Sequence, residues 1–367
     1  MNPLVELFSF GQSFWYDNIR RKFLVDGTLE AMIADDGLRG MTSNPSIFEK
    51  AIGGSDDYDT AVHALVRDGL DVNGIYEALA LADIQMACDL FLPLYESSDG
   101  TDGFVSLEVS PYLAHDTEGT VAEARRLRQA VGRPNVMIKV PATKAGIPAI
   151  RQLIGEGIHV NVTLMFNMAH YEAVAQAYMD GLRMFVKSGG DPKGVASVAS
   201  FFVSRVDTAV DKLLSASSHP SAQALLGKTA VANSKVVYQR FLELFHGDAF
   251  ADLRKAGARN QRLLWASTST KNPAYSDTLY VDELIGPETV NTMPQSTLDA
   301  FRDHGILSQS LTRDVEAAYE QLQALEVCGV DLTAVTEKLQ EDGVAAFSKS
   351  FDSLMATIET KIAVVQS

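Results

Sequence analysis

The chain has 367 residues, enough for one large domain or two domains of ordinary size. Hydrophobic residues make up 46% and charged residues 21%, as in soluble globular proteins, and the formal charge of −16 argues against nucleic acid or an anionic membrane as a partner. The only cysteines are Cys88 and Cys328, so we expect a reduced, cytoplasmic setting without disulfides. We find no signal-peptide pattern and no apolar run that predicts a membrane span.

Short apolar runs alternate with longer amphipathic stretches along the chain. The runs that predict strands are, in chain order, 37–43, 104–109, 136–140, 159–166, 195–203, 262–268 and 289–294, of which the first and last are weaker. Between them, stretches such as 120–132 and 169–190 have apolar residues three and four positions apart, which is typical of amphipathic helices. This alternation predicts an α/β fold with a parallel sheet. About eight such units favour a closed (β/α)8 TIM barrel over an open sheet.

Helix signals complete the predicted organisation. Asn44 before Pro45 has the pattern of a helix N-cap followed by proline in the first turn. An apolar stripe from Phe347 to Val365 predicts a C-terminal helix, from about residue 344, that packs on the barrel. No repeat, low-complexity tract or break in composition marks a second domain. We therefore expect a single domain over residues 1–367, with helices additional to those of the barrel.

Three of the predicted strands carry polar residues on one face. In the run 136–140 the valines and the isoleucine share a face, whereas Lys139 points the other way. The same alternation places Glu108 on the polar face of 104–109, and Asn161 and Thr163 on that of 159–166. We expect the aliphatic faces to meet the helices and the polar faces to point into the barrel. Glu108, Lys139 and Thr163 lie near the C-terminal ends of their strands, where catalytic residues of such barrels gather.

A lysine in this position suggests Schiff-base chemistry. A neutral lysine amine attacks a ketone, and the resulting iminium accepts electrons while a neighbouring C–C bond breaks. The protons need a carboxylate and a polarised water, which Glu108 and Thr163 could supply. The residues thus predict an enzyme that makes or breaks a C–C bond beside a ketone.

Each of these residues also has a structural interpretation. A strand lysine could be exposed at an edge or extend its amine to the surface. Glu108 could be only an ion-pair partner for Lys139, and Asn161 and Thr163 could be core polar groups with satisfied hydrogen bonds. Asn44 could be only a cap.

Other motifs predict nothing further. Gly227-Lys228-Thr229 resembles the end of a phosphate-binding loop, but Ala222 stands where the loop needs a glycine. The seven histidines show no metal-ligand spacing with another histidine or a cysteine, so we expect no metal.

Two segments together resemble a known family. GMTSNPSIFEK (40–50) and VMIKVPAT (136–143) are similar to the two signature segments of transaldolase, and SLEVSP, NVTLMF and SFFVSR follow in that family's order. The resemblance covers nearly the whole chain. It implies a class I aldolase barrel that transfers a dihydroxyacetone unit between sugar phosphates in the pentose phosphate pathway, without a cofactor.

The resemblance also implies roles for particular residues. Lys139 matches the Schiff-base lysine, Asp17 the acid/base aspartate, and Glu108 with Thr163 the pair that holds the catalytic water. The residues that match substrate contacts are Thr42, Asn44, Asn161, Ser200, Phe202 and Arg205.

The expected phosphate site departs from the family pattern. Many relatives have a second arginine soon after a serine, whereas here Ser267 is followed by Thr268, Ser269, Thr270 and Lys271. We expect Arg205 to be the main phosphate ligand, Lys271 to replace the second arginine as a point charge, and Ser267 to donate a hydrogen bond.

Two other functions stay open from the sequence. One is a simple aldolase that releases free dihydroxyacetone, and the other is a sugar-phosphate-binding barrel without catalysis. The presence of both Lys139 and Glu108 argues against the second. The sequence leaves the oligomeric state open between a monomer and a homodimer.

Overall fold

The protein forms a closed barrel of eight parallel strands, in a computed structural model that describes residues 2–366. Each strand pairs with the next in chain order, and the last pairs with the first. The predicted (β/α)8 fold is confirmed. The strands are β1 (Gln12–Asp17), β2 (Gly40–Thr42), β3 (Phe104–Glu108), β4 (Val136–Pro141), β5 (Val160–Met165), β6 (Ser197–Phe202), β7 (Arg262–Ala266) and β8 (Thr289–Met293).

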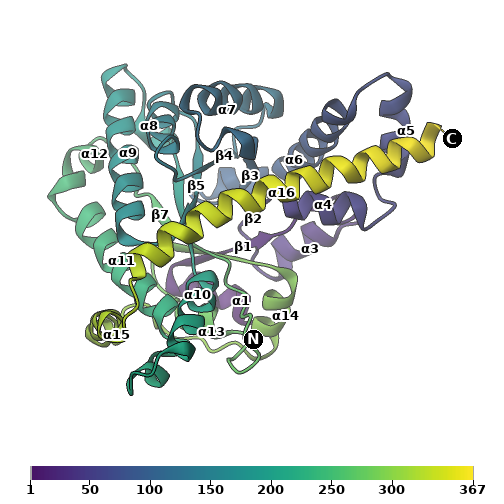
Figure 1. Cartoon of the computed structure of the whole chain (residues 1–367). Helices are drawn as coiled ribbons and strands as arrows, with labels where there is room; N and C mark the ends of the chain where they lie inside the picture. Colours follow the sequence, from purple (N-terminus) through teal and green to yellow (C-terminus); the bar gives the residue numbers. More distant parts are fainter. Residues whose placement is uncertain (1, 367) are drawn as a thin grey trace.

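Helices fill the connections and surround the barrel (Figure 1). The α-helices are α1 (Pro3–Glu6), α2 (Arg21–Val25), α3 (Thr28–Asp35), α4 (Pro45–Gly53), α5 (Asp59–Arg67), α6 (Val72–Ser97), α7 (Thr117–Val131), α8 (Gly146–Gly155), α9 (Met168–Lys187), α10 (Ser204–Ala216), α11 (Thr229–His246), α12 (Ala251–Lys255), α13 (Leu279–Asp282), α14 (Gln295–His304), α15 (Val315–Val327) and α16 (Leu332–Gln366). Short 3₁₀ helices are η1 (Leu7–Phe10), η2 (Pro111–Leu113), η3 (Pro192–Gly194), η4 (Ala222–Leu225) and η5 (Asp248–Phe250).

The strand register brings polar residues of neighbouring strands into one row. Glu108 of β3 pairs with Lys139 of β4, and Lys139 pairs with Asn161 of β5. Paired residues in a sheet point to the same side, so the three side chains lie next to one another. The residues beside Lys139, Ile138 and Val140, are fully buried on the opposite face, against the helices. The predicted division into an aliphatic outer face and a polar inner face is therefore present.

Strand β1 was not among the predicted strands. Its first two residues, Gln12 and Ser13, are polar and interrupt the apolar pattern. Both side chains nevertheless form hydrogen bonds inside the protein: the Gln12 amide N–H donates to the Leu284 carbonyl at 2.7 Å and the Ser13 hydroxyl donates to Asp102 at 3.0 Å. Their partners are distant in sequence, so no local pattern indicated the strand.

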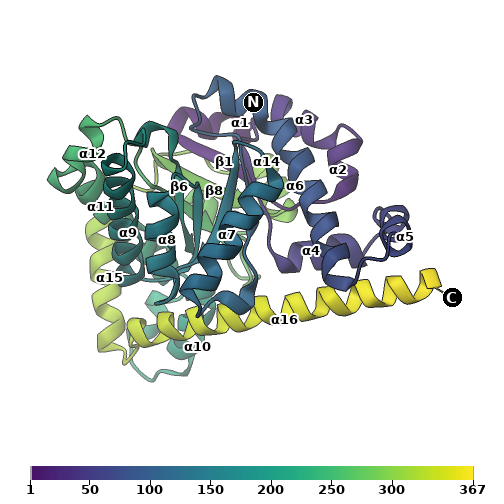
Figure 2. The ribbon, with the colours of Figure 1, turned by 90° about the horizontal axis from the view of Figure 1, so that it is seen from above.

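The C-terminal helix α16 is longer than predicted. It begins at Leu332 and not near residue 344. Its first turns place Leu332, Val335 and Leu339 against the core, but Gly343 interrupts this apolar stripe before Phe347, and polar side chains contact the barrel beside it. It lies along one end of the barrel and continues past it towards α4 and α5 (Figures 1 and 2). The carbonyls at the ends of β4 and β5 accept hydrogen bonds from it, so this is the C-terminal end of the strands.

Helix α6 runs for 26 residues and contains an 18-residue stretch with a mean hydropathy of 1.4. By length and composition it passes the test for a membrane span, which the sequence pattern did not indicate, and core helices of soluble proteins pass the same test. Its buried residues include Ile75, Leu79, Ile84 and Phe91, and it packs against β3. The helix is thus built into the barrel wall.

Candidate active site

A cavity of about 310 Å³ opens at the C-terminal ends of the strands. Seven of the eight strands, all except β3, contribute a residue to its lining. Glu108 and Asn161 are the predicted site residues that do not line it, whereas the others do: Asp17, Thr42, Asn44, Lys139, Thr163, Ser200, Phe202, Arg205, Ser267 and Lys271. The barrel thus brings together residues from the whole length of the sequence.

Lys139 lies at the floor of this cavity and is only 5% exposed. Its amine donates to the Ser43 carbonyl at 3.1 Å and lies 3.5 Å from a Glu108 carboxylate oxygen, the outer range of an ion pair. The ring of Phe347, from α16, covers it at 5.8 Å. The interpretation of Lys139 as an exposed or surface-reaching strand lysine is therefore wrong.

Two carboxylates flank the lysine. Burial raises the pKa of Asp17, although the Lys139 charge and the hydrogen bond from Thr42 oppose this. Burial likewise raises the pKa of Glu108, against the attraction of Lys139. A raised carboxylate pKa suits a group that must take up and return a proton near neutral pH. Glu108 also lines a neighbouring cavity of about 230 Å³, together with Phe351. Its ion pair with Lys139 is compatible with a catalytic role and with a purely structural one.

The two polar residues of β5 differ in their surroundings. The amide of Asn161 is satisfied on both sides, because it donates to Ser106 at 3.0 Å and accepts from Ser200 at 2.6 Å. Thr163 is fully buried from solvent, and its hydroxyl has no hydrogen-bond partner among the described residues. Since buried hydroxyls are almost always bonded, the free Thr163 hydroxyl points to a ligand or a water in the cavity. Asn161 lies below it as a support for Ser200.

Thr42 and Asn44 come from the end of β2. The Thr42 hydroxyl contacts Asp17 at 2.7 Å and Thr292 at 2.8 Å, so it orients the Asp17 carboxylate. The side-chain oxygen of Asn44 caps α4 by accepting from the Ile47 N–H at 3.0 Å, as the Asn-Pro pattern predicts. Asn44 also lines the cavity, so capping fixes its side chain there.

The side of the cavity formed by the loops after β6 and β7 is cationic. Arg205 packs on the ring of Phe202 at 5.1 Å, and burial lowers its pKa. Burial, together with the charges of Arg205 and Lys50, lowers the pKa of Lys271. Within residues 2–366, neither Arg205 nor Lys50 forms an ion pair with a carboxylate. On a protein with a formal charge of −16, cations without acidic partners indicate a site for an anion.

Ser267 adopts a left-handed backbone conformation, with φ of +56°. Its carbonyl accepts from the Ser204 N–H at 3.0 Å, and the two hydroxyls lie 3.0 Å apart. Non-glycine residues rarely adopt this conformation, and it turns the chain after β7 so that Ser269 and Lys271 line the cavity.

Sequence reasoning missed several residues that line the cavity, among them Lys50 and Phe347. Lys50 lies three positions after Ile47 and four after Ser46, so the three residues share the face of α4 that lines the cavity. That spacing was readable once the helix start at Asn44 was known. The approach of Phe347 had no local signal, since it depends on how α16 packs across the barrel.

This fold and site define the class of barrel aldolases that work through a lysine Schiff base. Within residues 2–366 no group of three or more histidine, cysteine or acidic side chains could hold a metal ion.

Comparisons with known proteins agree with this class. Residues 14–358 match the family model described as Transaldolase/Fructose-6-phosphate aldolase. A protein of Thiobacillus denitrificans named transaldolase is 50% identical, over 98% of this chain and all of that protein. Transaldolases of Trichodesmium erythraeum and Thermobifida fusca are 44% and 47% identical, each over at least 98% of both chains. The chain therefore belongs to the transaldolase/fructose-6-phosphate aldolase family, as the signature segments predicted.

Proposed function

We propose that the protein is a transaldolase. It transfers a dihydroxyacetone unit from sedoheptulose 7-phosphate or fructose 6-phosphate to glyceraldehyde 3-phosphate or erythrose 4-phosphate, in the non-oxidative pentose phosphate pathway. The observation that carries the proposal is the buried Lys139 amine at the cavity floor, in one barrel mouth with Asp17, Glu108 and the unpartnered hydroxyl of Thr163. The family and the names of its relatives support the same activity.

The donor binds with its two ends at opposite sides of the cavity. Its phosphate lies against Arg205 and Lys271, with Lys50 as an additional cation and the Ser267 hydroxyl as a donor. Its ketone lies over Lys139. Thr42 and Asn44 contact the hydroxyl groups near the ketone, Phe202 covers the sugar chain, and Ser200 contacts it from the side of Asn161.

Cleavage begins when the neutral Lys139 amine attacks the ketone carbon. A water held by Glu108 and Thr163 carries the proton to the carbinol oxygen, which leaves as water and gives an iminium. The Asp17 carboxylate then takes the proton of the C4 hydroxyl. The C3–C4 bond breaks, its electron pair moves into the iminium to give an enamine, and the aldehyde product leaves.

Transfer reverses these steps on a new acceptor. The enamine attacks the aldehyde carbon of the acceptor, and Asp17 returns its proton to the new hydroxyl. Water then hydrolyses the iminium, which releases the longer ketose and the free Lys139 amine. Atoms and charges balance without any cofactor or metal, so none is proposed.

A product assay with and without an acceptor tests the proposal. With fructose 6-phosphate and erythrose 4-phosphate we expect glyceraldehyde 3-phosphate and sedoheptulose 7-phosphate, and little turnover without the acceptor. Borohydride added with fructose 6-phosphate should attach a three-carbon unit to the peptide that carries Lys139. Free dihydroxyacetone as the main product would favour a simple aldolase, and a label on Lys144 would exclude Lys139.

The remaining features of the proposal concern the protein's surroundings. We propose that the chain acts in the cytoplasm as a single domain, as a monomer or a homodimer. Its partners are small sugar phosphates and not nucleic acid or a membrane. The net charge of −16 and the match of relatives over their full length support this.

A further inference from the structure

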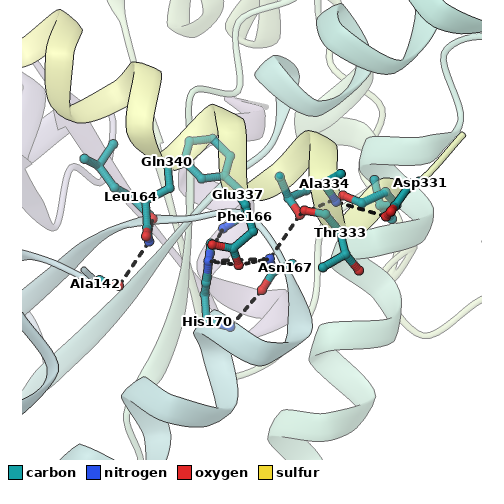
Figure 3. Close-up of polar contacts among 12 residues, drawn as sticks. Ala142, Leu164, Phe166, Asn167, His170, Asp331, Thr333, Ala334, Glu337 and Gln340 are labelled. Atoms are coloured by element: carbon teal, nitrogen blue, oxygen red, sulfur yellow. Dashed lines mark hydrogen bonds and ion pairs between the residues drawn. The ribbon is translucent and has the colours of Figure 1, made fainter. Parts of the chain in front are cut away.

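Side chains from the first three turns of helix α16 contact the barrel at the C-terminal ends of β4 and β5 (Figure 3). The Gln340 amide donates to the carbonyl of Ala142 at 3.0 Å and to that of Leu164 at 2.9 Å. Ala142 follows the end of β4, which carries Lys139, and Leu164 follows Thr163 in β5. One amide group therefore joins the two strands that hold the proposed nucleophile and one ligand of its water.

The end of β5 is irregular at this point. Leu164 has φ of +60°, a left-handed conformation that is strained for a leucine. The pairing of β5 with β6 shifts register between Val162 and Met165, so the strand bulges immediately after Thr163. A bulge of this kind redirects a side chain. Here it lies at Thr163, whose hydroxyl has no partner in the described structure.

A bulge also leaves a strand carbonyl without its usual partner in the sheet. Leu164 is 1% exposed, so water has little access to it, and an unbonded carbonyl there would be costly. The Gln340 amide supplies that hydrogen bond, and both of its N–H groups are used, one for each strand. The amide thus compensates for the conformation that places Thr163.

Neighbouring residues of α16 fit the same surface. Thr336 bonds to Asn167, which caps the start of α9 directly after the bulge. Glu337 contacts His170 in the first turn of α9 (Figure 3). A Cβ on Gly343 would lie 2.8 Å from the end of the Leu164 side chain, so the helix approaches this residue closely. Contacts on both sides of Gln340 therefore fix its distance from the strand ends.

We propose that Gln340 is a positioning residue, which holds the ends of β4 and β5 so that Lys139 and Thr163 keep their relative positions. The proposal rests on the proposed function for its kinetic consequence. It assigns α16 a part in the catalytic step, in addition to covering the barrel. Gln340 itself does not line the cavity, so it acts through the two strands.

Gln340→Met tests this, because methionine keeps the length of the side chain and removes both donors. Displacing a catalytic group by about 1 Å can cost about 100-fold in rate. We expect kcat to fall by roughly 10–100-fold and KM for fructose 6-phosphate to change by less than about threefold, since the cations are untouched. Gln340→Glu, which offers an acceptor where donors are needed, should be at least as impaired.

Lys338→Met is the matched control, because Lys338 is exposed on the same helix and, among the residues that the structure describes, forms an ion pair only with Asp342, one turn away. It should keep kcat within about twofold. A crystal structure of Gln340→Met gives a readout that does not depend on turnover, and it should show Leu164 and Thr163 displaced. An unchanged kcat, or an unchanged Thr163–Leu164 conformation, would overturn the inference. If the wild-type protein has no transaldolase activity, the proposed function fails and the crystal structure alone decides on Gln340.

Discussion

Three cations, Lys50, Arg205 and Lys271, line one side of the cavity, and each comes from a different part of the chain. Their mutual repulsion is evident at Lys271, where the charges of Arg205 and Lys50 add to burial in lowering the pKa. Proteins tolerate such repulsion where an anion is bound during function. A substrate phosphate would relieve it.

The residue-level prediction concerns this cationic side. Arg205→Ala should raise KM for fructose 6-phosphate roughly 10–100-fold, because a charged hydrogen bond contributes about 1.5–3 kcal/mol. Lys50→Met should raise it less, by about 3–10-fold, since Lys50 is exposed and screened. Steady-state kinetics with fructose 6-phosphate and with unphosphorylated fructose measures both effects. Equal losses on the two sugars would show that these residues do not bind phosphate.

The residues of the candidate site were predictable to different degrees. Lys139, Glu108 and Thr163 could be identified because strand alternation gives the face of each residue without further information. Whether a hydroxyl or amide on that face is free depends on neighbouring strands. Asn161 is satisfied by Ser106 and Ser200, whereas Thr163 has no partner among the described residues, and the sequence could not distinguish these cases.

At the scale of elements, a buried carboxylate ties three helices together. Asp207 of α10 is 1% exposed, accepts from the Ala230 N–H of α11 at 2.7 Å and accepts from the Tyr280 hydroxyl of α13 at 2.9 Å. Burial raises its pKa to about 6, in spite of these bonds. Because Arg205 is two residues away, this tie fixes the start of α10 beside the cavity.

The raised pKa predicts a pH-dependent stability. Between about pH 4, the value for an unfolded aspartate, and pH 6, the folded protein binds more protons at Asp207 than the unfolded chain. Its contribution to the free energy of unfolding therefore falls as pH rises through this window and stays low above it. Asparagine does not titrate. The free energy of unfolding of Asp207→Asn, relative to that of the wild type, should therefore rise by roughly 2–3 kcal/mol from pH 4 to pH 8.

Urea unfolding at several pH values measures this difference. Asp68→Asn, at an exposed position, is the control and should follow the wild-type profile. A constant difference between Asp207→Asn and wild type across the range would mean that Asp207 titrates normally.

Elements were predictable where their partners lie on one apolar face. The central strands met this condition, and so did α4, whose cap and proline are local signals. In strand β1 and the first turns of α16, polar residues interrupt the apolar pattern, among them Gln12, Thr336 and Gln340, whose partners lie far away in the chain. The length of α16 could therefore not be read from its apolar stripe.

At the scale of the whole molecule, one end of the barrel carries a buried ion cluster and the other carries the cavity. The N-terminal end of the strands is closed by Asp102, which is fully buried and bonds to Arg39 at 2.6 Å, to Arg262 at 2.9 Å and to Ser13 at 3.0 Å. Burial by itself would raise the pKa of Asp102, but Arg262 and Arg39 outweigh it and hold the pKa below its ordinary value. Such a cluster serves stability, whereas the opposite end carries the cavity.

Removing the Asp102 charge should therefore destabilise the fold. Asp102→Asn leaves two guanidinium groups without their carboxylate, which costs about 3–5 kcal/mol in buried clusters. The loss should be present at neutral pH and shrink as acid protonates Asp102 in the wild type, since a depressed pKa stabilises only above the unfolded value. Urea unfolding measures it. Glu156→Gln, in the more exposed pair with Arg125, should cost less than about 1 kcal/mol, and an equally small effect at Asp102 would contradict the prediction.

The position of α16 in the chain has a consequence for biosynthesis. All eight strands precede this 35-residue helix, so a ribosome has made the complete barrel before it makes the segment that carries Gln340 and Phe347. Gln340 lies well beyond Met293, the last residue of β8, so at about 5–20 residues per second it follows roughly 2–9 s later. During this interval a nascent barrel already displays its lysine and its cations, yet the Leu164 carbonyl still has no donor. Competence for catalysis would then arrive with the final helix, after the barrel itself.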